Sequence, residues 1–143
     1  MPHLTIDYSS RLAGAFDARA FVAELHPLVV EESGTSGVCK TLLRPAETYV
    51  GDAPGTQAFF VHVEVGLMPG RSEARKARLS ESVLALLGKH LPAGDGDRER
   101  VFLSVEVRDL AASYRLSPSA RLSRPGEPGR EGPNAIVRRT GPH

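Results

Sequence analysis

The second residue, Pro2, offers the most distinctive chemistry in this sequence. The chain begins Met-Pro-His, and aminopeptidases readily remove an initiator methionine that is followed by proline. Removal of Met1 leaves Pro2 with a free secondary amine at the tip of the chain. Burial and nearby cations both disfavour the charged form of an amine, so an enclosed prolyl nitrogen beside an arginine is expected to be neutral near pH 7. Such an amine is a good general base. The same start also arises by chance, because about one residue in twenty is proline.

Arg71 is the second candidate, and it lies in the stretch Pro-Gly-Arg-Ser at residues 69–72, where a helix is predicted to begin. The first N–H groups of a helix favour anions, and an arginine can hold a carboxylate through two parallel hydrogen bonds. A cation is unfavourable at a helix start, which favours a ligand-binding role for Arg71 over that of an ordinary surface arginine. Pro2 and Arg71 together predict a base and a carboxylate-binding group.

The periodicity of apolar residues predicts the elements that position these two residues. Alternation of apolar and polar side chains predicts strands over residues 2–8, 38–44, 58–65 and 100–107. Helical spacing predicts one helix after Asp17 and a second from Ser72 to about Leu91, with both polar residues as N-caps. The order is strand, helix, strand, twice over. With right-handed crossovers, it predicts an α+β fold in which tandem β-α-β units form a four-stranded sheet with two helices on one face.

The other face of this sheet is expected to pack against further copies of the chain, because small domains rarely leave a sheet face rich in branched residues in water. An open-faced monomer is the alternative. Residues 1–116 are predicted to form this domain. Residues 117–143 contain five prolines, four glycines and five arginines against two glutamates, a composition that predicts a disordered tail. The arginines of the tail can contact acidic partners, or they are simply solvated.

Composition excludes several functional classes. Cys39 is the single cysteine, which rules out an internal disulfide and a cysteine-based zinc site. The chain has no run long enough to span a membrane, no signal-peptide pattern and no dense basic face for nucleic acid. A cytoplasmic protein that binds neither membranes nor nucleic acid is therefore expected. His62 and Glu64 share one strand face, with Glu106 on the next strand, and hydrogen bonds between subunits are favoured there over a metal site.

Several stretches of the sequence resemble the tautomerase superfamily and, within it, the 5-carboxymethyl-2-hydroxymuconate isomerases. They are Met-Pro-His at the start, "LHPLV" at 25–29, "FFVHV" at 59–63 and "GRSEARKARLSESVLALLGKH" at 70–90. The resemblance covers roughly residues 2–110 and does not include the tail. It implies a homotrimer in which three sheets form a barrel-like core, with one pocket per subunit around Pro2. It also implies a small-molecule carboxylate as substrate and a reaction that requires no metal, nucleotide or organic cofactor.

The activity implied by this resemblance is an isomerase reaction, the keto–enol (allylic) tautomerisation of an unsaturated hydroxy or oxo dicarboxylate. Pro2 removes the hydroxyl proton of a dienol and returns a proton to a carbon further along the conjugated system, while Arg71 holds a carboxylate. Two alternatives remain open. One is another activity on the same fold, such as that of a phenylenolpyruvate tautomerase or a hydratase. The other is a non-catalytic trimeric binding protein, in which a retained Met1 blocks the amine.

The second predicted strand departs from the family pattern. The family has an arginine where this chain has Cys39, with Lys40 following it. Lys40 can supply the missing cation, but in a regular strand its side chain points to the face opposite that of Cys39. A one-residue slip or bulge would turn it back. Arg44 is a further candidate, and the last possibility is that neither residue binds substrate.

Overall fold

The computed structural model describes residues 1–35, 38–51, 57–91 and 99–117. The described elements run in the order β1 (His3–Ser9), a 3-10 turn (Ser10–Gly14), α1 (Ala18–Ser33), β2 (Lys40–Ala46), β3 (Gln57–Leu67), α2 (Glu73–His90) and β4 (Glu99–Asp109). Residues 118–143, nearly all of the predicted tail, lie outside the described residues. No helix within the described ranges is long and apolar enough to cross a membrane.

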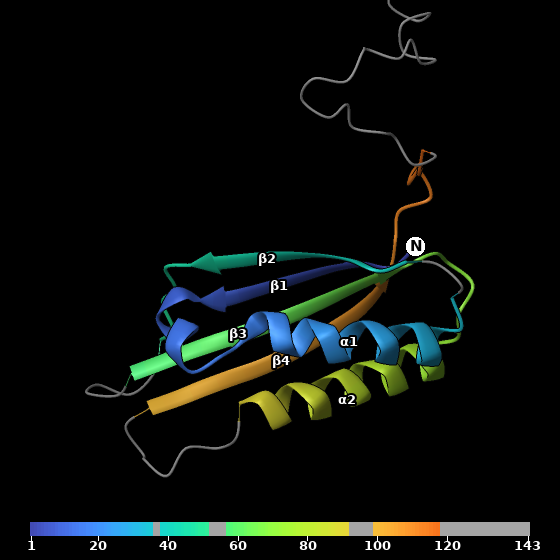
Figure 1. Cartoon of the computed structure of the whole chain (residues 1–143). Helices are drawn as coiled ribbons and strands as arrows, with labels where there is room; N and C mark the ends of the chain where they lie inside the picture. Colours follow the sequence, from blue (N-terminus) through green and yellow to red (C-terminus); the bar gives the residue numbers. More distant parts are fainter. Residues whose placement is uncertain (36–37, 52–56, 92–98, 118–143) are drawn as a thin grey trace, which may run out of the picture.

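The strands form one four-stranded sheet in the order β2-β1-β3-β4. The outer pairs, β1 with β2 and β3 with β4, are parallel, and the central pair, β1 with β3, is antiparallel. Each parallel pair is connected through one helix, and both helices cover the same face of the sheet (Figure 1). The predicted tandem β-α-β architecture is confirmed.

The core lies between the helices and the sheet. Each strand alternates, so its branched apolar residues point toward the helices, and each helix turns one apolar stripe toward them. The fully buried side chains are Leu4, Ile6, Val61, Val63, Val65, Leu67, Phe21, Leu25, Val29, Leu79, Val83 and Leu87. Burial of each such side chain contributes about 1.5–3 kcal/mol, and this packing fixes the strand ends that carry the candidate site.

Both predicted helix N-caps are confirmed. The Asp17 carboxylate accepts a hydrogen bond from the backbone N–H of Ala20 at 3.1 Å, and the Ser72 hydroxyl accepts one from the N–H of Arg75 at 3.1 Å. These bonds satisfy N–H groups that the first turn of a helix leaves without a partner. Gly34 caps the end of α1, and its φ of 71° is the left-handed conformation that glycine adopts without strain.

β2 extends two residues beyond its predicted end and includes Pro45. Proline has no N–H to donate to a neighbouring strand, and this is tolerated in β2 because β2 is an edge strand of the sheet. Its single neighbour is β1, where Tyr8 pairs with Pro45.

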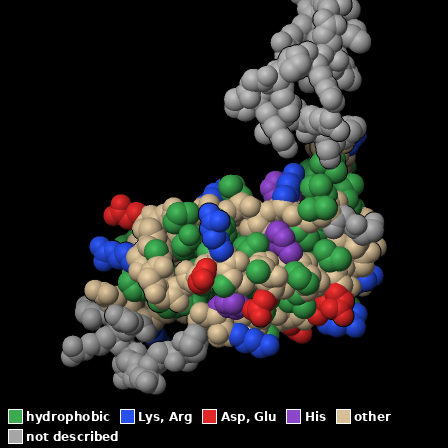
Figure 2. All heavy atoms as spheres, viewed as in Figure 1, with side chains coloured by type: hydrophobic (Ala, Val, Ile, Leu, Met, Phe, Trp, Pro, Cys, Tyr) green, Lys and Arg blue, Asp and Glu red, His purple; other side chains and the backbone are tan. Residues whose placement is uncertain are grey.

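The face of the sheet that the helices leave open is more polar than the sequence suggested. The branched residues of β1 and β3 point toward the helices, whereas the open face carries an ion pair between Asp7 and Arg44 and a second between Glu64 and Arg108. Its exposed apolar side chains are Leu42 and Phe102, which are 50% and 47% exposed. On the helix side, charges of both signs are interspersed over the surface (Figure 2).

Candidate active site

Pro2 is buried at the beginning of β1. Its carbonyl oxygen accepts a hydrogen bond from the backbone N–H of Lys40 at 3.2 Å, which fixes the start of the chain against β2. Burial raises the pKa of the neighbouring Cys39 thiol, and the positive charge of the chain's amino terminus acts in the opposite direction. Since His3 pairs with Lys40, Pro2 and Cys39 lie at the same end of the β1–β2 pair.

Arg71 is held by two backbone carbonyls. Its Nε donates to the oxygen of Ser33 at 2.8 Å, and its Nη1 donates to the oxygen of Met68 at 3.0 Å. Ser33 is the last residue of α1, and a helix C-terminus attracts cations. An arginine directly before α2 is thus explained by the end of α1, because its guanidinium stabilises that helix.

The anchoring of Arg71 leaves part of its guanidinium available. The two bonds use two of the five N–H donors that an arginine carries, and Nη2 has no partner among the described residues. A carboxylate can accept from the Nη1 and Nη2 end of the group without displacing either carbonyl. Arg71 is half-buried, so its side chain is held in place before any ligand arrives.

The sheet brings Pro2 and Arg71 to the same end of the molecule. His3 pairs with Gly66 across the antiparallel β1–β3 pair, so the residue before β1 lies level with the last residues of β3. Arg71 follows β3 in the chain and bonds to the Met68 carbonyl. The amino terminus and the right-hand end of α1 lie on the same side of the molecule (Figure 1).

Lys40 lies at this end as well, but its side chain takes the face opposite that of Cys39. The β1–β2 register is regular from His3–Lys40 to Ser9–Ala46, so the bulge that would turn Lys40 back is not formed. Cys39 is buried, and its thiol donates to the His26 carbonyl at 3.9 Å. Lys40 is exposed on the open face of the sheet, with its ammonium 5.6 Å from the centre of the Tyr114 ring.

Arg44, the other candidate for a second cation, lies elsewhere. It is four residues further along β2, about 13 Å away at about 3.3 Å per residue. Its Nε and Nη2 donate to the two carboxylate oxygens of Asp7 at 2.7 and 2.9 Å. This bidentate bond holds the pKa of Asp7 below its ordinary value and raises the pKa of Arg44. The structure does not bring Arg44 to Pro2.

Two of the three side chains considered for a metal site or a contact between subunits, His62 and Glu64, have partners within the chain. His62 Nδ1 and the Ser104 hydroxyl are 2.7 Å apart, and Arg108 Nε lies 2.9 Å from Glu64. In the part of the chain that the structure describes, no three His, Cys, Asp or Glu side chains gather to hold a metal.

Tyr114 was missed by the sequence analysis. It follows β4, in a segment that returns to the sheet through a bond from the Leu110 N–H to the Leu67 carbonyl at 2.7 Å. Leu110 packs directly on Gly66, where an added Cβ would lie 2.6 Å from its Cδ2. Tyr114 then reaches Lys40 of β2. Its hydroxyl is buried without a hydrogen-bond partner in the described chain.

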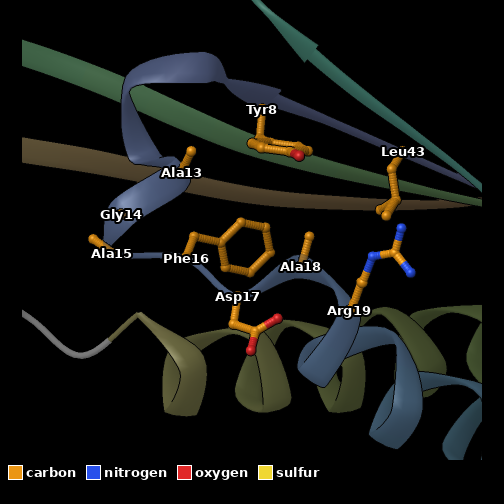
Figure 3. A pocket seen from close by; sticks show the side chains of 9 residues that line it. All are labelled: Tyr8, Ala13, Gly14, Ala15, Phe16, Asp17, Ala18, Arg19 and Leu43. Atoms are coloured by element: carbon orange, nitrogen blue, oxygen red, sulfur yellow. The ribbon is translucent and has the colours of Figure 1, made fainter.

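A hollow in the protomer lies away from these residues. Its lining residues, shown in Figure 3, are Tyr8, Ala13, Gly14, Ala15, Phe16, Asp17, Ala18, Arg19 and Leu43. They belong to the end of β1, the turn that follows it, the start of α1 and the middle of β2. Pro2 lies before the opposite end of β1, so this hollow is not the candidate site.

The chain is similar in sequence and in structure to proteins of one known family. The family model described as 5-carboxymethyl-2-hydroxymuconate isomerase matches residues 2–120. A crystal structure of a 5-carboxymethyl-2-hydroxymuconate isomerase from Deinococcus radiodurans R1 superposes with a TM-score of 0.69, at 22% identity over 83% of this chain and 90% of that one. A 5-carboxymethyl-2-hydroxymuconate delta-isomerase gives 0.65, at 26% identity over 83% and 89%.

The fold extends to more distant proteins. A fused 4-OT that forms a symmetric trimer superposes with a TM-score of 0.56, at 17% identity over 76% of this chain and 87% of that one. A search of the curated proteins finds no match.

Proposed function

Because the chain belongs to the 5-carboxymethyl-2-hydroxymuconate isomerase family, whose members are cofactor-independent isomerases, we propose that it tautomerises an unsaturated hydroxy or oxo dicarboxylate such as 5-carboxymethyl-2-hydroxymuconate. The amine of Pro2, freed by removal of Met1, is the general acid and base. The observation that carries this proposal is the burial of Pro2 at the tip of β1, at the same end of the sheet as an anchored arginine.

The reaction moves one proton and redistributes one conjugated system. The lone pair of the Pro2 nitrogen takes the hydroxyl proton of the dienol, the C–O bond becomes a carbonyl, and the double bonds shift along the chain of carbons. The remote carbon then takes a proton from the prolyl ammonium. Substrate and product are isomers, so the step balances with no external acid, base or electron carrier.

The surroundings of Pro2 favour the neutral amine that this reaction needs. Burial disfavours the ammonium, and a cation close to the nitrogen disfavours it further. The pyrrolidine ring fixes the backbone angle, and the bond from Lys40 to the Pro2 carbonyl holds the residue against β2. A base with a pKa near ambient pH transfers protons most effectively in both directions.

Arg71 binds one carboxylate of the substrate and stabilises the negative charge that develops as the hydroxyl proton leaves. The free end of its guanidinium supports this role, since Nε already holds the Ser33 carbonyl at the end of α1 and one Nη1 hydrogen holds the Met68 carbonyl after β3. Lys40 supplies a second cation for the other carboxylate, which is supported by its exposed ammonium at the same end of the sheet. The Arg71 guanidinium and the Lys40 ammonium together supply two positive charges for the two negative charges of a dicarboxylate.

The active protein is a homotrimer that associates through the open face of the sheet, and residues 1–116 are sufficient to form it. The half-exposed Leu42 and Phe102 on this face and the symmetric trimer formed by the 4-OT relative support the assembly. Light scattering coupled to gel filtration measures it directly, with a mass of three chains expected and a single-chain mass contradicting the proposal.

The function is tested by Pro2→Ala together with the intact mass of the purified protein. The expected mass lacks Met1. Substitution by alanine retains a terminal amine but loses the ring, so partial turnover of 5-carboxymethyl-2-hydroxymuconate with a shifted pH profile is expected. A fully retained Met1, or a variant that equals wild type on tautomerisable acids of both the muconate and the enolpyruvate type, would exclude this function.

A further inference from the structure

We propose that Tyr114 is a specificity-determining residue, whose hydroxyl donates a hydrogen bond to the substrate carboxylate that Lys40 attracts. This inference rests on the proposed function for the identity of the substrate class. It concerns a residue that no sequence motif marked, and it accounts for a buried polar group that has no partner within the described chain.

The path of the chain after β4 carries Tyr114 to Lys40, at the end of the sheet where the chain begins. The bond from the Leu110 N–H to the Leu67 carbonyl joins the residue after β4 to the end of β3, and Leu110 packs over Gly66. A turn follows, closed by the bond from the Tyr114 N–H to the Ala111 carbonyl at 2.9 Å. The ring of Tyr114 then lies under the ammonium of Lys40. The backbone N–H of Lys40 donates a hydrogen bond to the Pro2 carbonyl.

The glycine at position 66 makes this path possible. Gly66 pairs with His3 and with Arg108, and Leu110 occupies the space that a side chain would need, with its Cδ2 2.6 Å from where the Cβ would lie. A larger residue at position 66 would displace the Leu110 side chain. The close approach therefore seats Leu110 against the end of β3, four residues before Tyr114.

The missing hydrogen bond of the Tyr114 hydroxyl costs free energy in the folded protein. A buried hydroxyl without a hydrogen bond costs about 1–3 kcal/mol relative to one that is paired, and such groups are rare in folded proteins. The Lys40 ammonium does not satisfy it, because the ammonium lies over the face of the ring, where it interacts with the ring electrons. A ligand that brings an acceptor to the hydroxyl removes this cost.

A carboxylate is the acceptor that this environment selects. The Lys40 ammonium lies over the ring, and the Arg115 guanidinium bonds to the Tyr114 carbonyl at 2.8 Å, so the local potential favours an anion. A carboxylate has two oxygens and can accept from the ammonium with one and from the hydroxyl with the other. A neutral group such as a methyl would leave the hydroxyl unpaired and the cation without a counter-charge. The pair therefore discriminates a dicarboxylate from a monocarboxylate of the same shape.

A binding experiment separates this inference from the proposed catalysis. trans,trans-Muconate and sorbate share the same six-carbon diene and differ in the second carboxylate, and neither carries the hydroxyl that the reaction consumes. Calorimetric titration of the full-length protein gives a Kd for each. The wild type is expected to prefer muconate, and Tyr114→Phe, which removes only the hydroxyl oxygen, is expected to reduce the ratio of the two affinities by about tenfold, the loss of one hydrogen bond to a charged group.

Tyr49→Phe is the matched control. Tyr49 is 90% exposed and follows the far end of β2, so its variant is expected to keep the wild-type ratio. The melting temperature provides a second readout. Since the hydroxyl of Tyr114 makes no bond in the described chain, Tyr114→Phe is expected to melt at or above the wild-type temperature.

The outcomes are distinct. An unchanged muconate-to-sorbate ratio in Tyr114→Phe, or a wild type without a preference for muconate, overturns the role of Tyr114 even if the enzyme isomerises its substrate. A variant that melts several degrees lower with its ratio intact also overturns it, because the hydroxyl then bonds to protein in the assembled state. A tenfold loss of preference in a protein without isomerase activity supports Tyr114 and rejects the proposed function.

Discussion

The side chain of Arg71 bonds to the backbone carbonyl of Ser33, with the donor Nε 2.8 Å from the acceptor oxygen. The two residues are 38 positions apart in the chain, and the bond joins the segment before α2 to the last turn of α1. One arginine thereby stabilises a helix terminus and presents the rest of its guanidinium at the end of the sheet where the chain begins.

Substitution of Arg71 is expected to affect stability as well as turnover. Arg71→Ala removes two hydrogen bonds to carbonyls and is expected to lower the free energy of unfolding by about 1–2 kcal/mol. It is also expected to reduce kcat/KM for a dicarboxylate substrate by roughly 10- to 100-fold, because a charge-assisted bond to the carboxylate is lost. Urea unfolding and steady-state kinetics measure the two effects.

Arg75→Ala is the control that separates the effect on stability from the effect on turnover. Arg75 also bonds to the end of α1, through its Nε and the Glu32 carbonyl at 3.0 Å, and it carries the same charge one turn into α2. This variant is expected to lose a similar amount of stability while its kcat/KM stays within about twofold of wild type. Equal kinetic losses in both variants would mean that Arg71 acts only through the fold.

The ion pair between Asp7 and Arg44 predicts a pH dependence of stability. The pKa of Asp7 is lowered in the folded protein, chiefly by the hydrogen bond from Arg44, below the value of about 3.9 expected in the unfolded chain. The stabilisation is therefore fully present above about pH 4, and it is lost as pH falls through the folded-state pKa. The pair is partly exposed, so the effect is small.

Asp7→Asn measures this contribution. The variant is expected to melt slightly below wild type at pH 7, and the difference between the two melting temperatures is expected to narrow as the pH is lowered toward 2. A difference that is constant from pH 7 to pH 2 would show that the carboxylate charge of Asp7 contributes nothing through Arg44.

Two leucines one turn apart on α2 test which face of this helix packs against the sheet. Leu87 is fully buried against the sheet, whereas Leu84 is 41% exposed. Leu87→Ala is expected to cost about 2–5 kcal/mol, the range for a buried leucine, and Leu84→Ala about 1 kcal/mol or less. Equal costs in urea unfolding would contradict the assignment of the helix faces.

The elements were predictable because local patterns determine them. Alternation in "AFFVHVEV" marked β3, and Asp17 and Ser72 marked the helix starts through bonds that span three residues. The same alternation placed Lys40 on the face opposite Cys39. Strand alternation and helix N-caps each depend on residues only a few positions apart. The strands and helices that they predict are therefore found in the tertiary structure.

The contacts that define the site were less predictable, because they join residues far apart in the chain. Nothing near Arg71 indicates that its partner is Ser33, so the sequence suggested a role for α2 where the structure shows one for α1. Tyr114 has no periodic neighbours beyond β4, and its position depends on the packing of Leu110 on Gly66. The partners of these side chains depend on how the strands and helices pack together, which local sequence patterns do not show.

Removal of residues 118–143 tests the predicted division of the chain. The truncated protein ends after the described segment that contains Tyr114, so it keeps every residue assigned to the site. Its mass in light scattering and its kcat/KM are expected to equal those of the full chain. A truncated protein that dissociates or loses turnover would assign the tail a role in assembly.

The protonation of the Pro2 nitrogen is the central claim, and nitrogen-15 NMR of protein labelled with [15N]proline measures it directly. The account predicts an amine resonance that titrates with a pKa below about 8, the ordinary value of an α-amino group, and that shifts upward in Arg71→Ala. Absence of any titrating proline nitrogen, as in a chain that keeps Met1, or a pKa above about 8 that Arg71→Ala leaves unchanged, would contradict it.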